Sequence, residues 1–191
     1  DSSTATGTGA SAVGSAARWD TASVPRRDRS EQVSSSPALD DVRPAVDGAL
    51  GRFLGDRRAE LAGLDLSAPA LVDELLRLLE AGGKRVRPAL CFWAFAAAGG
   101  SRGDPIVRVC AALELLHTSA IVHDDLMDRD DERRGVPSTH VRFAKEAPAG
   151  SDPDAFGTAA AVLVGDLALV LSERLMRTSG FAGDRLERAM S

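Results

Sequence analysis

The chain has 191 residues, of which 44% are hydrophobic and only 4% are aromatic, with no tyrosine. Its formal net charge of -5 argues against general nucleic-acid binding, which needs a basic surface. A composition rich in Ala and Leu and poor in aromatic residues favours packed helices over a β-sandwich.

Residues 1–37 are mostly Ser, Thr, Ala and Gly, with little apolar periodicity. This composition predicts a disordered tail, followed by one folded domain over 38–191. From Leu39 to Leu64, apolar residues recur mostly at three- and four-residue steps, which is typical of an amphipathic helix.

The next two helices are separated by glycine and proline. Ser67 and Pro69 begin a helix rich in leucine, and Gly82-Gly83 ends it. Arg87-Pro88 then opens a very apolar third helix over Ala89–Ala98.

The rest of the chain also has helical periodicity. Asp104-Pro105 begins a long helix, with Asp as its cap and Pro at the first helical position, that reaches about Met127. A polar loop is expected over 129–152, a helix over 154–176, and the beginning of another helix over 180–191. No strand signal competes, so the sequence predicts an all-α fold.

Two cysteines, Cys91 and Cys110, lie in apolar stretches without the spacing of metal ligands. They are expected to be reduced and buried in a cytoplasmic protein. No stretch approaches about 18 uninterrupted apolar residues, and the sequence therefore predicts no membrane span.

An acidic cluster ends the long helix, with the sequence HDDLMD over 123–128. Asp124 and Asp128 are four residues apart, so their carboxylates lie on one face, and His117 lies further back along the same line. Carboxylates at a helix C-terminus repel each other and oppose the helix dipole. A cation is therefore expected, and Mg²⁺ suits aligned carboxylates with open positions. A solvated acidic helix end is the alternative.

Basic residues flank this cluster in the sequence. Lys84 and Arg87 surround the turn after Gly82-Gly83, where they could bind phosphate or simply be surface charges. Arg133 and Arg134 follow the acids in a loop constrained by Gly and Pro, and could grip two anions or pair with neighbouring carboxylates. Together these groups predict two anionic groups held side by side, one of them bridged by metal.

Four blocks resemble the trans-isoprenyl diphosphate synthases, which make farnesyl, geranylgeranyl or longer diphosphates. They are GGKRVRP at 82–88, LELLHTSAIVHDDLMD at 113–128, RRGVPSTH at 133–140 and AVLVGDLAL at 161–169. Each is modest alone, but their order and spacing make the resemblance specific from about Leu39 onward.

The resemblance implies the role of each site residue. Asp124, Asp125 and Asp128 would form the first aspartate-rich motif, in which Asp124 and Asp128 hold Mg²⁺ against the allylic diphosphate, and Arg133 would contact that diphosphate. The diphosphate of isopentenyl diphosphate would be held by Lys84, Arg87, His117 and Arg134.

The implied fold is an isoprenoid-synthase-type bundle of helices around a central cavity, usually a homodimer. In that family, the residues four and five before the first Asp gate the product tunnel. Here they are Ala120 and Ser119, both small, and the acid motif lacks a two-residue insertion seen in many farnesyl-type enzymes. The expected product is therefore C20 or longer.

The family carries a second acid motif, and nothing after Arg129 matches it. The bundle is therefore expected to be incomplete at its C-terminus, with activity of this chain alone in question and with apolar faces exposed. A catalytically inactive partner subunit, or a fragment of a synthase, is the alternative. A class I terpene cyclase would share the acid motif but would not need GGKRVRP or the paired arginines.

Overall fold

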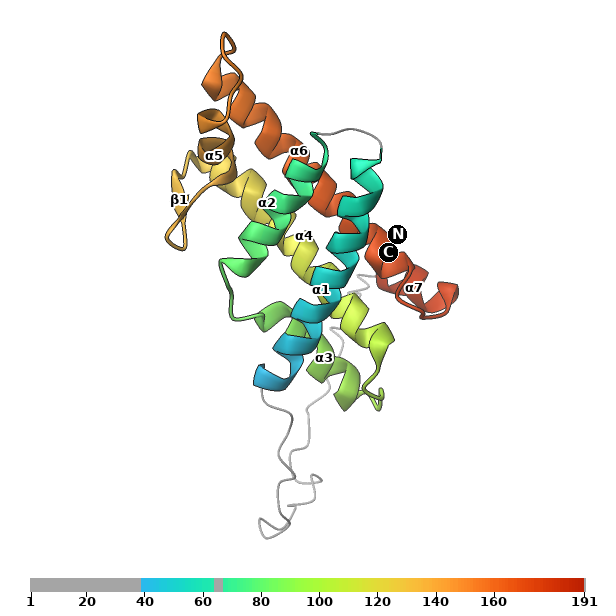
Figure 1. Cartoon of the computed structure of the whole chain (residues 1–191). Coiled ribbons are helices and arrows are strands. Elements are labelled where there is room, and N and C mark those ends of the chain that lie inside the picture. Colours follow the sequence, from blue (N-terminus) through green and yellow to red (C-terminus); the bar gives the residue numbers. More distant parts are fainter. Residues whose placement is uncertain (1–38, 64–66, 191) are drawn as a thin grey trace, which may run out of the picture. The chain divides into compact units, whose positions relative to one another are not determined.

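The computed structural model describes residues 39–63 and 67–190, and the expected tail over 1–37 lies outside them. The described part is helical apart from two strands of two residues each, so the all-α prediction is confirmed (Figure 1). In chain order the elements are α1 (Leu39–Ala62), α2 (Pro69–Glu80), α3 (Val86–Ala97), α4 (Asp104–Asp128), β1 (Glu132–Arg133), β2 (Val136–Pro137), α5 (Thr139–Lys145), α6 (Pro153–Arg177) and α7 (Gly183–Met190).

The two longest paired helices, α4 and α6, pack side by side along their lengths. Small buried residues let the two backbones approach each other. Ala111 and Ala112 on α4 are fully buried, and so are Ala161 and Ala168 on α6. The Ser172 hydroxyl on α6 donates to the Ala112 carbonyl oxygen at 2.8 Å. This pair forms the centre of the fold, and α4 carries most of the candidate site.

Helices α1, α2 and α3 pack around α4 (Figure 1). On α1, Val46, Leu50 and Leu54 recur every four residues and are each at most 2% exposed. This row forms the apolar stripe that the sequence periodicity predicts. It joins Leu75 of α2 and Leu115 of α4 in one continuous core.

Two predicted helix starts differ from the structure. The third helix begins at Val86, with Arg85 in the left-handed region at its N-terminus, so Pro88 lies within the first turn, where proline is tolerated. The long helix begins at Asp104 but is preceded by Gly103 as the cap residue, and the Asp104 side chain makes no capping bond. The prediction that Asp104 is the cap was wrong.

The segment over 129–152, predicted as a loop, contains a hairpin and a short helix. The Arg134-Gly135 dipeptide joins β1 to β2 with φ values of 57° and 80°. Two central residues with positive φ match the tight turn that suits the twist of a two-stranded hairpin. The sequence carries no signal for this hairpin, because two-residue strands are too short to produce an alternating pattern.

Helix α5 follows the hairpin and packs against α6. Its Phe143 is buried, and a Cβ at Gly157 of α6 would overlap the His140 carbonyl oxygen. Asp152, expected to be a loop residue, caps α6 by accepting from the Asp154 and Ala155 backbone N–H groups.

Helices α4 and α6 are each long and apolar enough to cross a membrane, by length and composition alone. Half of the apolar window of α4 and 44% of that of α6 are buried inside the fold, and core helices of globular proteins pass the same test. Both cysteines are free thiols; Cys110 is fully buried and Cys91 is half-buried.

Candidate functional site

The acid end of α4 presents two carboxylates outward and one inward. Asp124 and Asp128 are exposed, one helical turn apart, while Asp125 is only 2% exposed. The backbone N–H groups of Arg129 and Asp130 both donate to the Asp125 carbonyl oxygen as the helix ends. The pair predicted to hold Mg²⁺ therefore shares one open face, and Asp125 does not share it.

Arg133 lies among these acids. Its guanidinium pairs with the buried Asp125 carboxylate and lies 3.5 Å from Asp124 and 3.4 Å from Asp130. The Asp125 carboxylate, through its hydrogen bond, raises the pKa of Arg133. Arg133 thus acts as an internal counter-ion beside the open face that carries Asp124 and Asp128.

Arg134 points elsewhere, as expected for two neighbouring arginines in a constrained hairpin. Its guanidinium donates to the Gly82 carbonyl oxygen, and a Cβ at Gly83 would lie 2.9 Å from it. The side chains of Arg133 and Arg134 therefore reach two different loops. The hairpin connects the acid end of α4 with the basic turn before α3.

Four basic residues were predicted to hold the diphosphate of isopentenyl diphosphate. Their side chains all line one cavity, which has a volume of about 350 Å³. Arg87 and His117 are in direct contact, with 2.9 Å between Arg87 Nη1 and His117 Nε2. Lys84 and Arg134 also line the cavity, together with Gly83, Arg85, Val86 and Glu114. We call this cavity the basic pocket. The structure brings these four residues together, and their binding role stays a prediction.

The surroundings of His117 favour the neutral form of its imidazole. Burial, and then the nearby positive charge of Arg87, lower its pKa from the ordinary value. A neutral imidazole can accept the Arg87 hydrogen bond at Nε2 and keep its own proton on Nδ1 as a donor. The basic pocket therefore offers guanidinium, ammonium and imidazole donors together.

Arg85 was not singled out from the sequence, yet it positions the basic pocket. It is 6% exposed and donates to Glu114 at 2.7 Å, to Asp47 at 2.8 Å and to the Leu79 carbonyl oxygen at 2.9 Å. Its left-handed backbone, with φ of 48°, turns the flanking Lys84 and Arg87 outward. A glutamate inside an otherwise apolar helix, Glu114, was the available sequence signal.

Glu74 is a second buried charge that the sequence did not reveal. Its carboxylate is fully buried and binds Arg77 at 2.6 and 2.7 Å, the Thr139 hydroxyl at 2.8 Å, and Arg142. Burial opposes its ionisation, but these hydrogen bonds outweigh burial and lower the pKa of Glu74. Since Arg77 also donates to the Pro137 carbonyl at 2.9 Å, this cluster fixes the hairpin and α5 onto α2.

The two residues predicted to gate product length lie on different faces of α4. Ser119 is 4% exposed and points into the fold. Ala120 is exposed and belongs to a row with Leu116, Asp124 and Asp128 at four-residue steps. Only Ala120 shares the open face with the acids.

The donor set on this face fits a divalent cation that takes further ligands from phosphate and water. Within 39–63 and 67–190, no three His, Cys, Asp or Glu side chains converge into a complete metal site. Mg²⁺ is typically held by one or two protein carboxylates together with substrate phosphates. Asp124 and Asp128 provide such a pair, and their role stays a prediction.

Comparisons with known proteins agree with these features. The family model described as "Polyprenyl synthetase" matches residues 69–190. Geranylgeranyl pyrophosphate synthase 9, chloroplastic, of Arabidopsis thaliana is 39% identical over 146 residues, covering 70% of this chain and 37% of that protein. The short chain isoprenyl diphosphate synthase of Methanothermobacter thermautotrophicus is 39% identical over 92 residues, covering 48% of this chain and 28% of that protein.

Among solved structures, geranylgeranyl pyrophosphate synthase from Corynebacterium glutamicum, complexed with isoprenyl diphosphate and magnesium, is similar to this chain. Its TM-score is 0.71 at 30% identity, over 78% of this chain and 44% of the other. The chain spans roughly a third of the curated relatives it matches, with 28% and 37% covered. The matched family model includes the acid end of α4, the basic pocket and the hairpin, and the chain belongs to the polyprenyl synthetase family.

Proposed function

We propose that this chain supplies the first acid motif and the isopentenyl diphosphate site of a prenyltransferase that joins isopentenyl diphosphate to an allylic diphosphate. One observation carries the proposal: the hairpin sets Arg133 at the acid end of α4 and Arg134 in the basic pocket. Two adjacent anion sites are what the coupling of two diphosphate esters requires.

In this proposal, Asp124 and Asp128 hold the metal on the open face of α4. Mg²⁺ bound there supplies electrostatic stabilisation of the charge that develops on the leaving diphosphate. Arg133, already directed at this face, donates to the same diphosphate as the allylic C–O bond breaks.

The basic pocket holds the second substrate. Arg87, Lys84 and Arg134 bind its diphosphate, and neutral His117 donates through its remaining N–H. The double bond of isopentenyl diphosphate attacks the allylic cation, and loss of a proton completes the step. No nucleophilic Ser or Cys is required.

The product is proposed to be C20 or longer. Ala120 is small and lies on the open face of α4, one turn before Asp124. Ala120→Phe is therefore expected to shorten the product of an active assembly, measured by mass. A homodimer in the cytoplasm is proposed as the working form. The exposed apolar surface on α4 and α6 supports the dimer.

Binding is the decisive test, because turnover also depends on the wall that carries the second acid motif in the family. Isothermal titration calorimetry with a non-hydrolysable allylic diphosphate analogue should show Mg²⁺-dependent binding that Asp124→Ala abolishes. Asp184→Asn is the control, because Asp184 is exposed on α7 and pairs only with Arg188 among the described side chains. Equal binding with and without Mg²⁺, or by wild type and Asp124→Ala, would contradict the proposal.

Turnover is measured on the same protein. Purified chain is incubated with isopentenyl diphosphate and dimethylallyl, geranyl or farnesyl diphosphate, and products are identified by mass. Mg²⁺-dependent products of C20 or longer that Asp124→Ala abolishes would show that this chain catalyses alone. Binding without products would assign it half of the catalytic site.

A further inference from the structure

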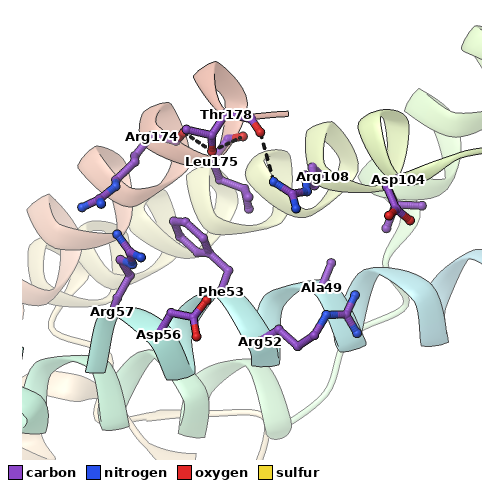
Figure 2. Close-up of a pocket in the computed structure, with 11 residues that line it drawn as sticks. Ala49, Arg52, Phe53, Asp56, Arg57, Asp104, Arg108, Arg174, Leu175 and Thr178 are labelled. Carbon is purple, nitrogen blue, oxygen red and sulfur yellow. Dashed lines mark hydrogen bonds between the residues drawn. The ribbon is translucent and has the colours of Figure 1, made fainter. Parts of the chain in front are cut away.

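A second pocket, of about 440 Å³, lies between α1, the beginning of α4 and the end of α6 (Figure 2). Four arginines line it over an apolar wall that includes Phe53: Arg52, Arg57, Arg108 and Arg174. We call it the arginine pocket. On α4, Arg108 precedes His117 of the basic pocket by nine residues, which places them about 13 Å apart along the helix. The two pockets share no lining residue.

The four arginines come from three helices and lie in two groups of two. Figure 2 shows Arg57 and Arg174 toward one end of the pocket, with Arg52 and Arg108 toward the other and the Phe53 ring between them. Such an arrangement is unexpected in a chain with a net charge of -5, since like charges on separate helices repel each other.

Acidic groups around the pocket do not balance these arginines. Asp56 and Asp104 are its acidic lining residues. Glu60 pairs with Arg57 at 2.6 Å and with Arg174 at 3.5 Å. Among the described side chains, three carboxylates thus accompany four guanidinium groups, which leaves one positive charge.

Arg57 has donors that the described chain does not satisfy. Its side chain is 15% exposed, and its Nη2 atom pairs with Glu60. The Nε and Nη1 atoms are buried without a hydrogen-bond partner within 39–63 and 67–190. Buried N–H groups of a charged side chain are costly to leave unpaired. The guanidinium lies 5.5 Å from the Phe53 ring centroid, which holds it at the pocket.

At the other end of the pocket, Arg108 and Arg52 also have N–H donors that are not engaged by the described residues. Arg108 uses Nη1 to donate to the Thr178 carbonyl oxygen at 3.1 Å, which engages one of its five N–H donors. Arg52 is exposed and forms no ion pair with the side chains that the structure describes. A ligand with several acceptor oxygens would accept hydrogen bonds from these donors and, at the other end, from Arg174, whose side chain is 51% exposed.

We propose that the arginine pocket binds a phosphate or diphosphate group. Arginines that approach from three helices match a tetrahedral oxyanion, which offers acceptors in several directions, better than a planar carboxylate, which offers two oxygens in one plane. The volume accommodates the two linked phosphates of a diphosphate as well as a single phosphate. This site is independent of the proposed function and does not use the acid end of α4.

The experiment is calorimetry on the whole chain carrying Arg87→Gln, which disables the basic pocket. Sodium phosphate and sodium diphosphate are titrated separately in Mg²⁺-free buffer, with ionic strength held constant by sodium chloride. Binding is expected to persist in Arg87→Gln, and to weaken at least about tenfold when Arg52→Gln or Arg57→Gln is added. The preferred titrant distinguishes phosphate from diphosphate.

Arg177→Gln, added to the same Arg87→Gln protein, is the matched control. Arg177 is exposed near the end of α6 and pairs with Glu173 at 2.7 Å outside the pocket. Its substitution should change binding less than about twofold. Because Arg52 is exposed and pairs with no carboxylate that the structure describes, Arg52→Gln keeps the test valid if Arg57→Gln fails to fold.

Three results would overturn the proposal. Arg87→Gln alone could abolish the binding of phosphate and diphosphate, which would assign that binding to the basic pocket. Binding could survive both Arg52→Gln and Arg57→Gln, or Arg177→Gln could weaken it equally. If the wild-type chain shows no Mg²⁺-dependent binding of the allylic analogue, the proposed function is contradicted. The proposal for the arginine pocket is unaffected by that result.

Discussion

At the scale of single residues, the site depends on arginines with buried carboxylate partners. Arg133 neutralises Asp125 beside the open face of α4, and Arg85 neutralises Glu114 at the wall of the basic pocket. Each pair fixes the backbone at the site from inside the fold. The residue next to each pair in the sequence is exposed: Asp124 beside Asp125, and Lys84 beside Arg85. Removing one partner of such a pair leaves an uncompensated charge inside the protein, which costs more than the pair contributes.

Arg133→Gln should therefore lower the free energy of unfolding by about 3 kcal/mol, because Asp125 is left buried and charged. Urea unfolding followed by circular dichroism measures this change. Adding Asp125→Asn should restore part of the loss, since the variant then has no buried charge. If the loss of stability in the double variant equals the sum of the losses in Arg133→Gln and Asp125→Asn, the coupling of these residues is refuted.

Glu74→Gln should lower stability at pH 7 by about 3 kcal/mol, because it leaves Arg77 and Arg142 without their shared carboxylate. The pKa of Glu74 is lowered in the folded state. The carboxylate therefore stabilises the fold above its unfolded pKa, and this contribution is lost as pH falls through the folded pKa.

Unfolding of wild type and Glu74→Gln at several pH values between 7 and 3 checks this expectation. The difference between them should shrink toward acid. The exposed Glu173, which pairs with Arg177, gives the control Glu173→Gln, expected to change stability by less than about 0.5 kcal/mol. A difference that stays constant across this pH range would contradict the sign derived for Glu74.

At the scale of elements, the contact between α4 and α6 depends on small residues. A Cβ at Gly165 of α6 would overlap the imidazole of His123, directly before the acid pair. His123 Nε2 lies 3.5 Å from the Val162 carbonyl oxygen and 3.7 Å from Asp166. The position of the helix turn that carries Asp124 therefore depends on how closely α6 approaches α4.

Gly165→Ala should destabilise the chain by about 1–3 kcal/mol, because the added methyl group must displace His123 or separate the helices. Gly55→Ala is the matched control: Gly55 also lies inside a helix, and a Cβ there would have no atom within 4 Å. That control should stabilise by about 0.5–1 kcal/mol through helix propensity. Thermal unfolding of both variants measures the contrast, and equal shifts would refute the close-packing argument.

At the scale of the whole described molecule, apolar surface remains exposed on the paired long helices. Leu116 and Met127 on α4, and Leu163, Leu169 and Val170 on α6, are between 44% and 75% exposed. Large exposed apolar side chains gathered on neighbouring helices mark surfaces that pack against another chain or segment.

The chain is accordingly expected to self-associate at micromolar concentration, as measured by sedimentation velocity over a range of concentrations. Leu163→Glu with Val170→Glu should shift the distribution toward the monomer, because charges at an apolar contact are costly to bury. Arg177→Glu, on the same helix, is the control for added negative charge. A monomer at all concentrations would exclude this surface as a contact between copies.

The sequence by itself determined the longer helices and most of the candidate site residues, whereas α5 lies in a segment that it predicted as a loop. Apolar periodicity, glycine pairs and prolines are local signals, so α1, α2, α4 and α6 were placed within a few residues. The four motif blocks also identified Lys84, Arg87, His117 and Arg134, which the structure then brought into one pocket. Such residues are readable because chemistry requires particular residue types at particular spacings.

Only the tertiary structure decided which of these groups face one another. The inward turn of Asp125, the role of Arg85 and the buried Glu74 cluster each depend on at least one distant partner: Arg133 for Asp125, Asp47 for Arg85 and Arg142 for Glu74. The arginine pocket likewise joins residues from three helices that no local pattern relates. Burial and charge pairing are properties of distant segments packed together, so no window of sequence contains them.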